Sequence, residues 1–133
     1  MALYAGAPRA ELLGVVARTV HVTQDSAVAV AYGCAAALVL EAALLGSSAT
    51  AAVTAAADWI KQQATAPAGA GVQLPPEVGV PASVWADVGA ALDRVVGMAA
   101  VPPLEAAAEL GRNCHLPTSL QTALQVVLHV EWL

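Results

Sequence analysis

The sequence predicts an all-α fold, a compact orthogonal bundle of about six helices that forms one domain over residues 1–133. Apolar residues recur at helical spacing in one segment after another, and no segment alternates apolar and polar residues as a half-buried strand does. Apolar residues make up 59% of the chain but aromatic residues only 4%. The core must therefore consist of closely packed helices rich in Ala, Leu and Val.

Three helices are expected in the first half of the chain. The segment PRAELLGVVARTV, residues 8–20, has a proline suited to a first turn and places its leucines and valines on one face. A second helix over about residues 24–45 follows a turn rich in capping oxygens and ends at Gly46. A third, over residues 48–64, begins at the paired serines that come next.

Residues 65–81 are rich in Pro and Gly and break the helical pattern. We interpret this segment as a surface loop within the domain, since neither flanking part looks self-sufficient. Three further helices are expected at residues 81–99, 102–111 and 118–133. The last of these starts with a Thr-x-x-Gln capping box at Thr118.

The second helix raises the question of a membrane span. It carries no charge from residue 27 to residue 40, which is shorter than the roughly 20 apolar residues that a span needs. Many of these residues are alanine, which inserts weakly into membranes. We therefore expect a buried central helix and no membrane partner.

Charge and cysteine content narrow the class of protein further. The net charge is −5, and the cations are scattered, so we expect no nucleic-acid partner. Two cysteines, Cys34 and Cys114, make no disulfide framework, and residues 1–20 lack the pattern of a secretory signal. These features predict an intracellular, cytoplasmic protein. Only 11% of residues are charged, so we expect an oligomer, or a missing portion of the domain, to cover some apolar faces.

Chemistry-bearing residues form no complete catalytic or metal-binding pattern. Cys114 and His115 are adjacent, but no Cys-x-x-Cys or His-x-x-x-His pair supports them as zinc ligands. His21, Asp25 and Ser26 surround a turn without the context of a nucleophile elbow. We therefore assign no catalytic residue and no metal ligand.

Two polar turns are candidates for ligand binding. His21 lies ahead of the N-terminus of the second helix, where free N–H groups and the helix dipole favour an anion such as a phosphate. The stretch GRNCH, residues 111–115, offers a similar turn ahead of the last helix. The two turns form either one ligand-facing edge or simple caps between helices.

Two stretches resemble the ADP-ribosylglycohydrolases, and most closely the type that removes ADP-ribose from serine. These are ARTVHVTQDSAVAVAYGCAAALVLEAALLG, residues 17–46, and ELGRNCHLPTSLQTALQVVLH, residues 109–129. The resemblance implies an all-α, magnesium-dependent hydrolase of the bond between ADP-ribose and an acceptor. It also implies ADP-ribose, or a protein that carries it, as the partner.

The same resemblance implies two Mg²⁺ ions held by acidic motifs near the two ends of the family domain, the second of them Gly-Gly-Asp-x-Asp-Thr. Neither motif occurs in this sequence, so the Mg²⁺ ligands are absent. We therefore expect the chain to represent the central part of such a domain and to be inactive alone. The alternatives are a non-catalytic protein that still binds ADP-ribose and a helical protein-interaction module.

The resemblance also implies which residues meet the ligand. His21 matches the family histidine that contacts ADP-ribose, although Val20 stands where the family has threonine. Asn113 and Cys114 fall on the turn that lines the adenosine side, and Thr118 replaces a common carboxylate. The expected ligand-binding residues are thus His21, Asn113 and Cys114.

Overall fold

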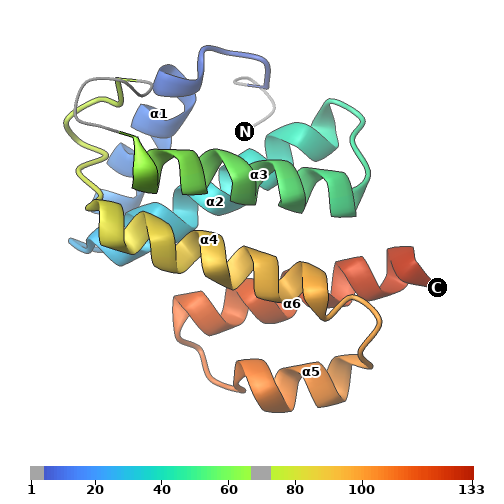
Figure 1. Cartoon of the computed structure of the whole chain (residues 1–133). Coiled ribbons are helices and arrows are strands. Elements are labelled where there is room, and N and C mark those ends of the chain that lie inside the picture. Colours follow the sequence, from blue (N-terminus) through green and yellow to red (C-terminus); the bar gives the residue numbers. More distant parts are fainter. Residues whose placement is uncertain (1–4, 67–72) are drawn as a thin grey trace.

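A computed structural model describes residues 5–66 and 73–133. Within these residues the chain forms six α-helices and no strand, which confirms the all-α prediction (Figure 1). The helices are α1 (Arg9–His21), α2 (Ala27–Leu44), α3 (Ala49–Thr65), α4 (Ala82–Gly97), α5 (Pro103–Leu110) and α6 (Leu116–Trp132). Part of the expected loop at 65–81 lies outside the described residues.

The predicted serine caps are present at two helix starts. Ser26 has extended backbone at φ −148°, and its side chain accepts a hydrogen bond from the backbone N–H of Ala29. Ser48 does the same for Ala51 at the start of α3. In each case a side-chain oxygen satisfies an N–H group that has no partner inside the helix. Local sequence therefore decides where these two helices begin.

The capping box predicted at Thr118 is wrong. Helix α6 begins two residues earlier, at Leu116, and His115 stands at the cap position without a side-chain cap hydrogen bond. Pro117 explains the shift, because its fixed φ and missing N–H suit the first helical turn. Thr118 thus lies inside the first turn of the helix.

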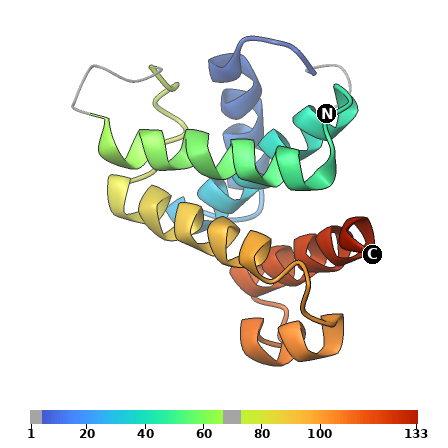
Figure 2. The same ribbon diagram turned by 45° about the vertical axis from the view of Figure 1, so that its right-hand side comes forward.

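Helix α2 is the central element of the fold. It contacts α1, α3, α4 and α6, and more than half of its residues are buried, as predicted. Among the described residues it is also the one helix long and apolar enough to cross a membrane by length and composition, a test that the core helix of a soluble protein passes as well. Helix α1 runs across α3 and α4 rather than alongside them, as the orthogonal prediction requires (Figure 2).

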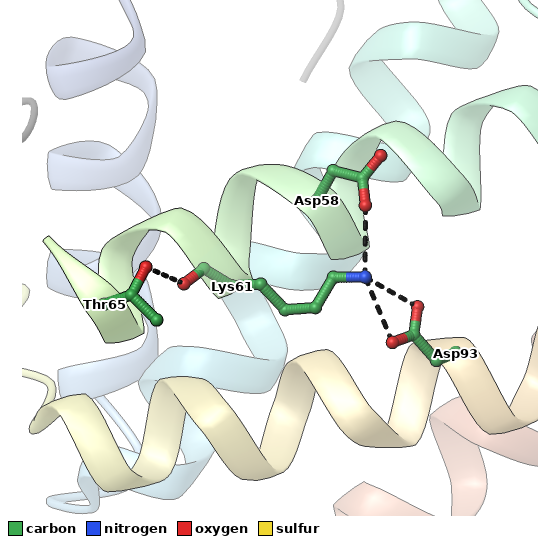
Figure 3. Close-up of polar contacts among 4 residues, drawn as sticks. All are labelled: Asp58, Lys61, Thr65 and Asp93. Carbon is green, nitrogen blue, oxygen red and sulfur yellow. Dashed lines mark hydrogen bonds and ion pairs between the residues drawn. The ribbon is translucent and has the colours of Figure 1, made fainter.

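Helices α3 and α4 form an antiparallel pair that packs on α2 (Figure 1). At its buried side, the rings of Trp59 and Trp85 meet edge to face with centroids 6.1 Å apart. At its exposed side, the ammonium of Lys61 lies 3.1 Å from carboxylate oxygens of both Asp58 and Asp93 (Figure 3). Hydrogen bonds to Asp93 and then to Asp58 raise the pKa of Lys61.

Helices α5 and α6 form a second hairpin below this pair (Figure 2). Leu128 joins α6 to the main core, whereas α5 has a small apolar cluster of its own around Ala106 and Leu110. Gly111 ends α5 with φ at 109°, a conformation that favours glycine. The resulting turn brings the chain back toward the start of α2.

Candidate ligand-binding site

Residues from the two polar turns identified in the sequence line the same pocket in the fold. Together they enclose an open pocket of about 630 Å³ between the N-termini of α2 and α6. The lining residues are Gln24, Ser26, Val28, Ala29, Asn113, Cys114, His115, Leu116 and Pro117. The pocket is thus built from segments almost 90 residues apart in the chain, and whether it faces a ligand stays a prediction.

Asn113 shapes the second turn of the pocket. Its side-chain oxygen accepts a hydrogen bond from the backbone N–H of His115 at 3.0 Å, which holds the turn just before α6. Arg112 donates to the backbone oxygen of Leu104 at 3.2 Å and ties the turn back to α5. The start of α6 is therefore presented to the pocket by a turn that is fixed on both sides.

Electrostatics at this pocket favour an anion. Neither α2 nor α6 has an acidic residue in its first turn, and the lining residues named above carry no carboxylate. The nearby Asp25 has a fully exposed side chain. Two helix N-termini that open into one hollow place two positive dipole ends there. Phosphate or carboxylate groups of a ligand would meet favourable potential and polar side chains.

Apolar surface lies beside these polar groups. Val28 and Leu116 are large apolar residues of the lining and are 38% and 37% exposed. Pro117 and Ala29 add to the same wall. A pocket that combines anion-favouring helix ends with an apolar shelf suits a molecule with both phosphate and ring parts.

His21 is not among the residues that line this pocket, although Asn113 and Cys114 are. It lies at the end of α1, where its Nε2 donates to the backbone oxygen of Glu77 at 3.0 Å. Its Nδ1 lies 3.8 Å from the carboxylate of Asp25. The structure therefore brings two of the three expected ligand residues together and places the third beside the loop after residue 73.

Glu77 strengthens the attachment of this loop to α1. Its carboxylate pairs with the guanidinium of Arg18. A hydrogen bond from its own backbone N–H, and then the contact with Arg18, lower the pKa of Glu77. His21 and Arg18, both on α1, thus contact the same residue, Glu77. Both contacts attach the loop at Glu77 to α1.

Sequence reasoning did not single out Gln24, Leu116 and Pro117, and it weighed His115 of the GRNCH turn only as a zinc ligand. All four flank the two predicted helix starts. They line one pocket only because the fold brings the two turns together, and the local sequence pattern does not predict that arrangement. Ser26 was considered only as a cap and as a member of an incomplete triad.

The two thiols have opposite environments. Cys114 is exposed at the pocket, whereas Cys34 is completely buried in α2. Burial raises the pKa of Cys34 to about 12. In the parts of the chain that the structure describes, no three His, Cys, Asp or Glu side chains gather in a group that could hold a metal ion.

Comparison of the chain with models of known protein families, with curated proteins and with solved structures found no match in any of the three.

Proposed function

We propose that this chain binds ADP-ribose, or a protein-linked ADP-ribosyl group, in the pocket between the N-termini of α2 and α6. The observation that carries the proposal is the meeting of two helix N-termini, neither with an acidic residue in its first turn, in one pocket of about 630 Å³. A diphosphate would lie near the two helix ends. Its adenosine part would rest on the wall formed by Val28 and Leu116.

The resemblance of residues 17–46 and 109–129 to ADP-ribosylglycohydrolases supports the same ligand. That resemblance rests on the sequence, while the shape and charge of the pocket are independent features of the fold. Since Asn113 and Cys114 belong to both, they are the residues we assign to the ligand. We expect His21 to act only indirectly, because its Nε2 donates to Glu77.

The proposal concerns binding rather than hydrolysis by this chain alone. Hydrolases of the resembled family use Mg²⁺ held by acidic motifs, and these motifs do not occur in the sequence. We expect the purified chain with Mg²⁺ to release no ADP-ribose from modified serine or arginine. Measurable turnover would contradict this part of the proposal.

Calorimetric titration with ADP-ribose tests the binding. Leu116→Glu places a carboxylate in the first turn of α6, where the helix dipole stabilises it, so folding should be preserved. The same carboxylate would repel a diphosphate, and we expect binding to be lost. Leu104→Glu is the matched control, because Leu104 lies in the first turn of α5, does not line the pocket and is 79% exposed.

Two outcomes would overturn the binding proposal. One is the absence of any saturable heat with millimolar ADP-ribose. The other is equal affinity in the wild type and Leu116→Glu. Titrations with inorganic phosphate and with adenosine separate the anion contacts from the apolar wall, since each probe presents only one half of the ligand.

A second candidate function is self-association through α6. Val126, Val130 and Leu133 follow one another at helical spacing and are 40%, 67% and 84% exposed. A second copy could cover this run by a two-fold contact, in which each α6 buries the same face of the other. Light scattering tests this candidate. We expect Val130→Glu to convert a dimer to a monomer, and a wild-type monomer would contradict it.

A further inference from the structure

Helix α2 contains one charged residue in an otherwise apolar helix. Glu41 lies near its C-terminal end and is only 5% exposed. Burial of a carboxylate is unfavourable unless opposite charge and hydrogen bonds compensate for the lost water. The contacts of Glu41 therefore indicate which groups compensate its buried charge.

Among the described residues, Glu41 has few partners. Its Oε1 accepts one hydrogen bond, from the backbone N–H of Gly6 at 3.2 Å. Its Oε2 lies 3.6 Å from Nη2 of Arg9, an ion pair that is too long for a hydrogen bond. A carboxylate can accept about four hydrogen bonds. Within residues 5–66 and 73–133, the contacts of Glu41 thus leave acceptor capacity unused, chiefly at Oε2.

A hollow of about 300 Å³ adjoins this carboxylate. Glu41 and Arg9 both line it, and four alanines of α2 and α3 form an apolar wall of small side chains, namely Ala42, Ala52, Ala55 and Ala56. This hollow shares no lining residue with the pocket between α2 and α6. It is a separate feature of the molecule.

Arg9 lies where its guanidinium could bind a second charged group of a ligand, a carboxylate. Its guanidinium lies 5.6 Å from the centre of the Trp59 ring, and its side chain is 39% exposed. The ring face stabilises the cation and orients it beside the hollow. A planar guanidinium can donate two parallel hydrogen bonds to a carboxylate.

We propose that this hollow binds a free α-amino acid with a small aliphatic side chain. The ammonium of the ligand would donate to Oε2 of Glu41, and its carboxylate would accept from the guanidinium of Arg9. The aliphatic group would lie against the alanine wall. Because Glu41 and Arg9 are already neighbours of opposite charge, they match the adjacent ammonium and carboxylate of a zwitterion.

The test follows the indole N–H resonance of Trp59 and the backbone amides of α3 by NMR during titration. L-Valine is the probe, isobutylamine lacks its carboxylate, and isovalerate lacks its ammonium. We expect saturable shifts with L-valine and at least about tenfold weaker binding of each one-charge analogue. Equal binding of isobutylamine would contradict the role of Arg9, and the absence of saturable shifts with L-valine would overturn the proposal.

Two variants separate the site from the stability of the fold. Glu41→Gln keeps the shape and the acceptor for Gly6 but removes the charge, and we expect L-valine affinity to fall about tenfold or more. Ala55→Leu keeps both charges and fills the hollow from an exposed position on α3, so it should abolish binding even if Glu41→Gln fails to fold. Ala51→Leu, also exposed on α3 but outside the lining, should bind as the wild type does. Unchanged affinity in Ala55→Leu would overturn the proposal.

Discussion

The carboxylate of Glu131, near the end of α6, caps the N-terminus of α3 at Thr50, which lies 81 residues earlier in the chain. Its Oε2 accepts from the backbone N–H of Thr50 at 2.7 Å and from the Thr50 hydroxyl at 2.6 Å. Its Oε1 accepts from the backbone N–H of Ala49, also at 2.7 Å. The start of α3 thus has a capping carboxylate from another helix in addition to its own Ser48.

These contacts predict that Glu131→Gln lowers the thermal midpoint of unfolding. The Thr50 hydroxyl, then the backbone N–H groups of Thr50 and Ala49, lower the pKa of Glu131 from its ordinary 4.5. A carboxylate with a lowered folded-state pKa contributes stability above its unfolded-state pKa and loses it as pH falls through the folded value. The difference between wild type and variant should therefore be full near pH 7 and shrink below about pH 4.5, as thermal melts across pH would record.

Glu109→Gln is the control for this prediction, because Glu109 is an exposed glutamate on α5. Its melting should follow the wild type at every pH. A constant difference between Glu131→Gln and the wild type down to pH 3 would show that the ionised carboxylate is not what holds α3 and α6 together.

Where α3 packs on α4, Gly89 leaves no room for a larger side chain. A Cβ added at Gly89 would lie 2.8 Å from Cγ of Lys61, whose ammonium bridges Asp58 and Asp93. Gly89→Ala must therefore displace Lys61, and this cost opposes the gain of about 1 kcal/mol that alanine has over glycine in a helix. We expect Gly89→Ala to be neutral or destabilising in urea unfolding.

A double-mutant cycle isolates this clash. In a Lys61→Ala background the Cγ atom is absent, so Gly89→Ala should stabilise by up to about 1 kcal/mol. Gly97→Ala serves as a control in the wild type, because a Cβ there would meet nothing within 4 Å, and it should stabilise without any second change. Equal effects of Gly89→Ala in both backgrounds would exclude the steric explanation.

A buried glutamine fixes the loop between α4 and α5. The Gln125 side chain is completely buried, and its Nε2 donates to the backbone oxygens of Met98 and Val101 at 3.1 and 2.8 Å. Gln125→Met keeps the length of the side chain but leaves the backbone oxygen of Val101 without this donor, whereas the oxygen of Met98 still accepts from the backbone N–H of Val101. A buried polar group without a partner costs about 1–3 kcal/mol, so a loss in this range is expected in urea unfolding.

The neighbouring Gln121 provides the comparison for this variant. It is also buried, but its Nε2 donates only to Pro117, one turn earlier in the same helix. Gln121→Met breaks no link between helices and should cost clearly less than Gln125→Met. Equal losses would mean that the two variants report packing volume rather than the contacts of Gln125.

These sites also show how far the sequence could predict the structure. Ser26 and Ser48 were predicted as caps because capping is a local event, decided within four residues. The start of α6 was misplaced at Thr118 because two local signals disagree. The capping box indicates a start at Thr118, whereas Pro117 favours the first helical turn, and the helix begins at Leu116. The helical periods and the Pro/Gly break likewise gave the six helices, with ends within a few residues.

The sites themselves depend on contacts that no local pattern reports. The sequence placed His21 at the ligand edge, yet the loop at Glu77 occupies its Nε2, and that loop is 56 residues away. In the sequence, Glu41 is only the first charge after the uncharged stretch of residues 27–40, and its contacts depend on Gly6 and Arg9, which the fold places beside it. The caps at Ser26 and Ser48 were predictable from local sequence, whereas the partners of His21 and Glu41 depend on tertiary packing.

The two cysteines give a prediction that joins the fold to the proposed site. Burial raises the pKa of Cys34 from its ordinary 9.0 to about 12. Near neutral pH, Cys34 therefore carries about three orders of magnitude less of the reactive thiolate than a free cysteine, and it is also sterically shielded. Cys114 is exposed at the pocket.

Titration of the native protein with Ellman's reagent at pH 8 should thus modify one thiol rapidly, and denaturant should expose the second. Cys114→Ser should remove the rapid phase, and Cys34→Ser should leave it intact. If ADP-ribose occupies the pocket, saturating ligand should slow the reaction of Cys114, because the ligand covers the sulfur. Rapid modification of Cys34 in the folded protein would contradict its burial, while an unprotected Cys114 in the presence of bound ADP-ribose would place the ligand elsewhere.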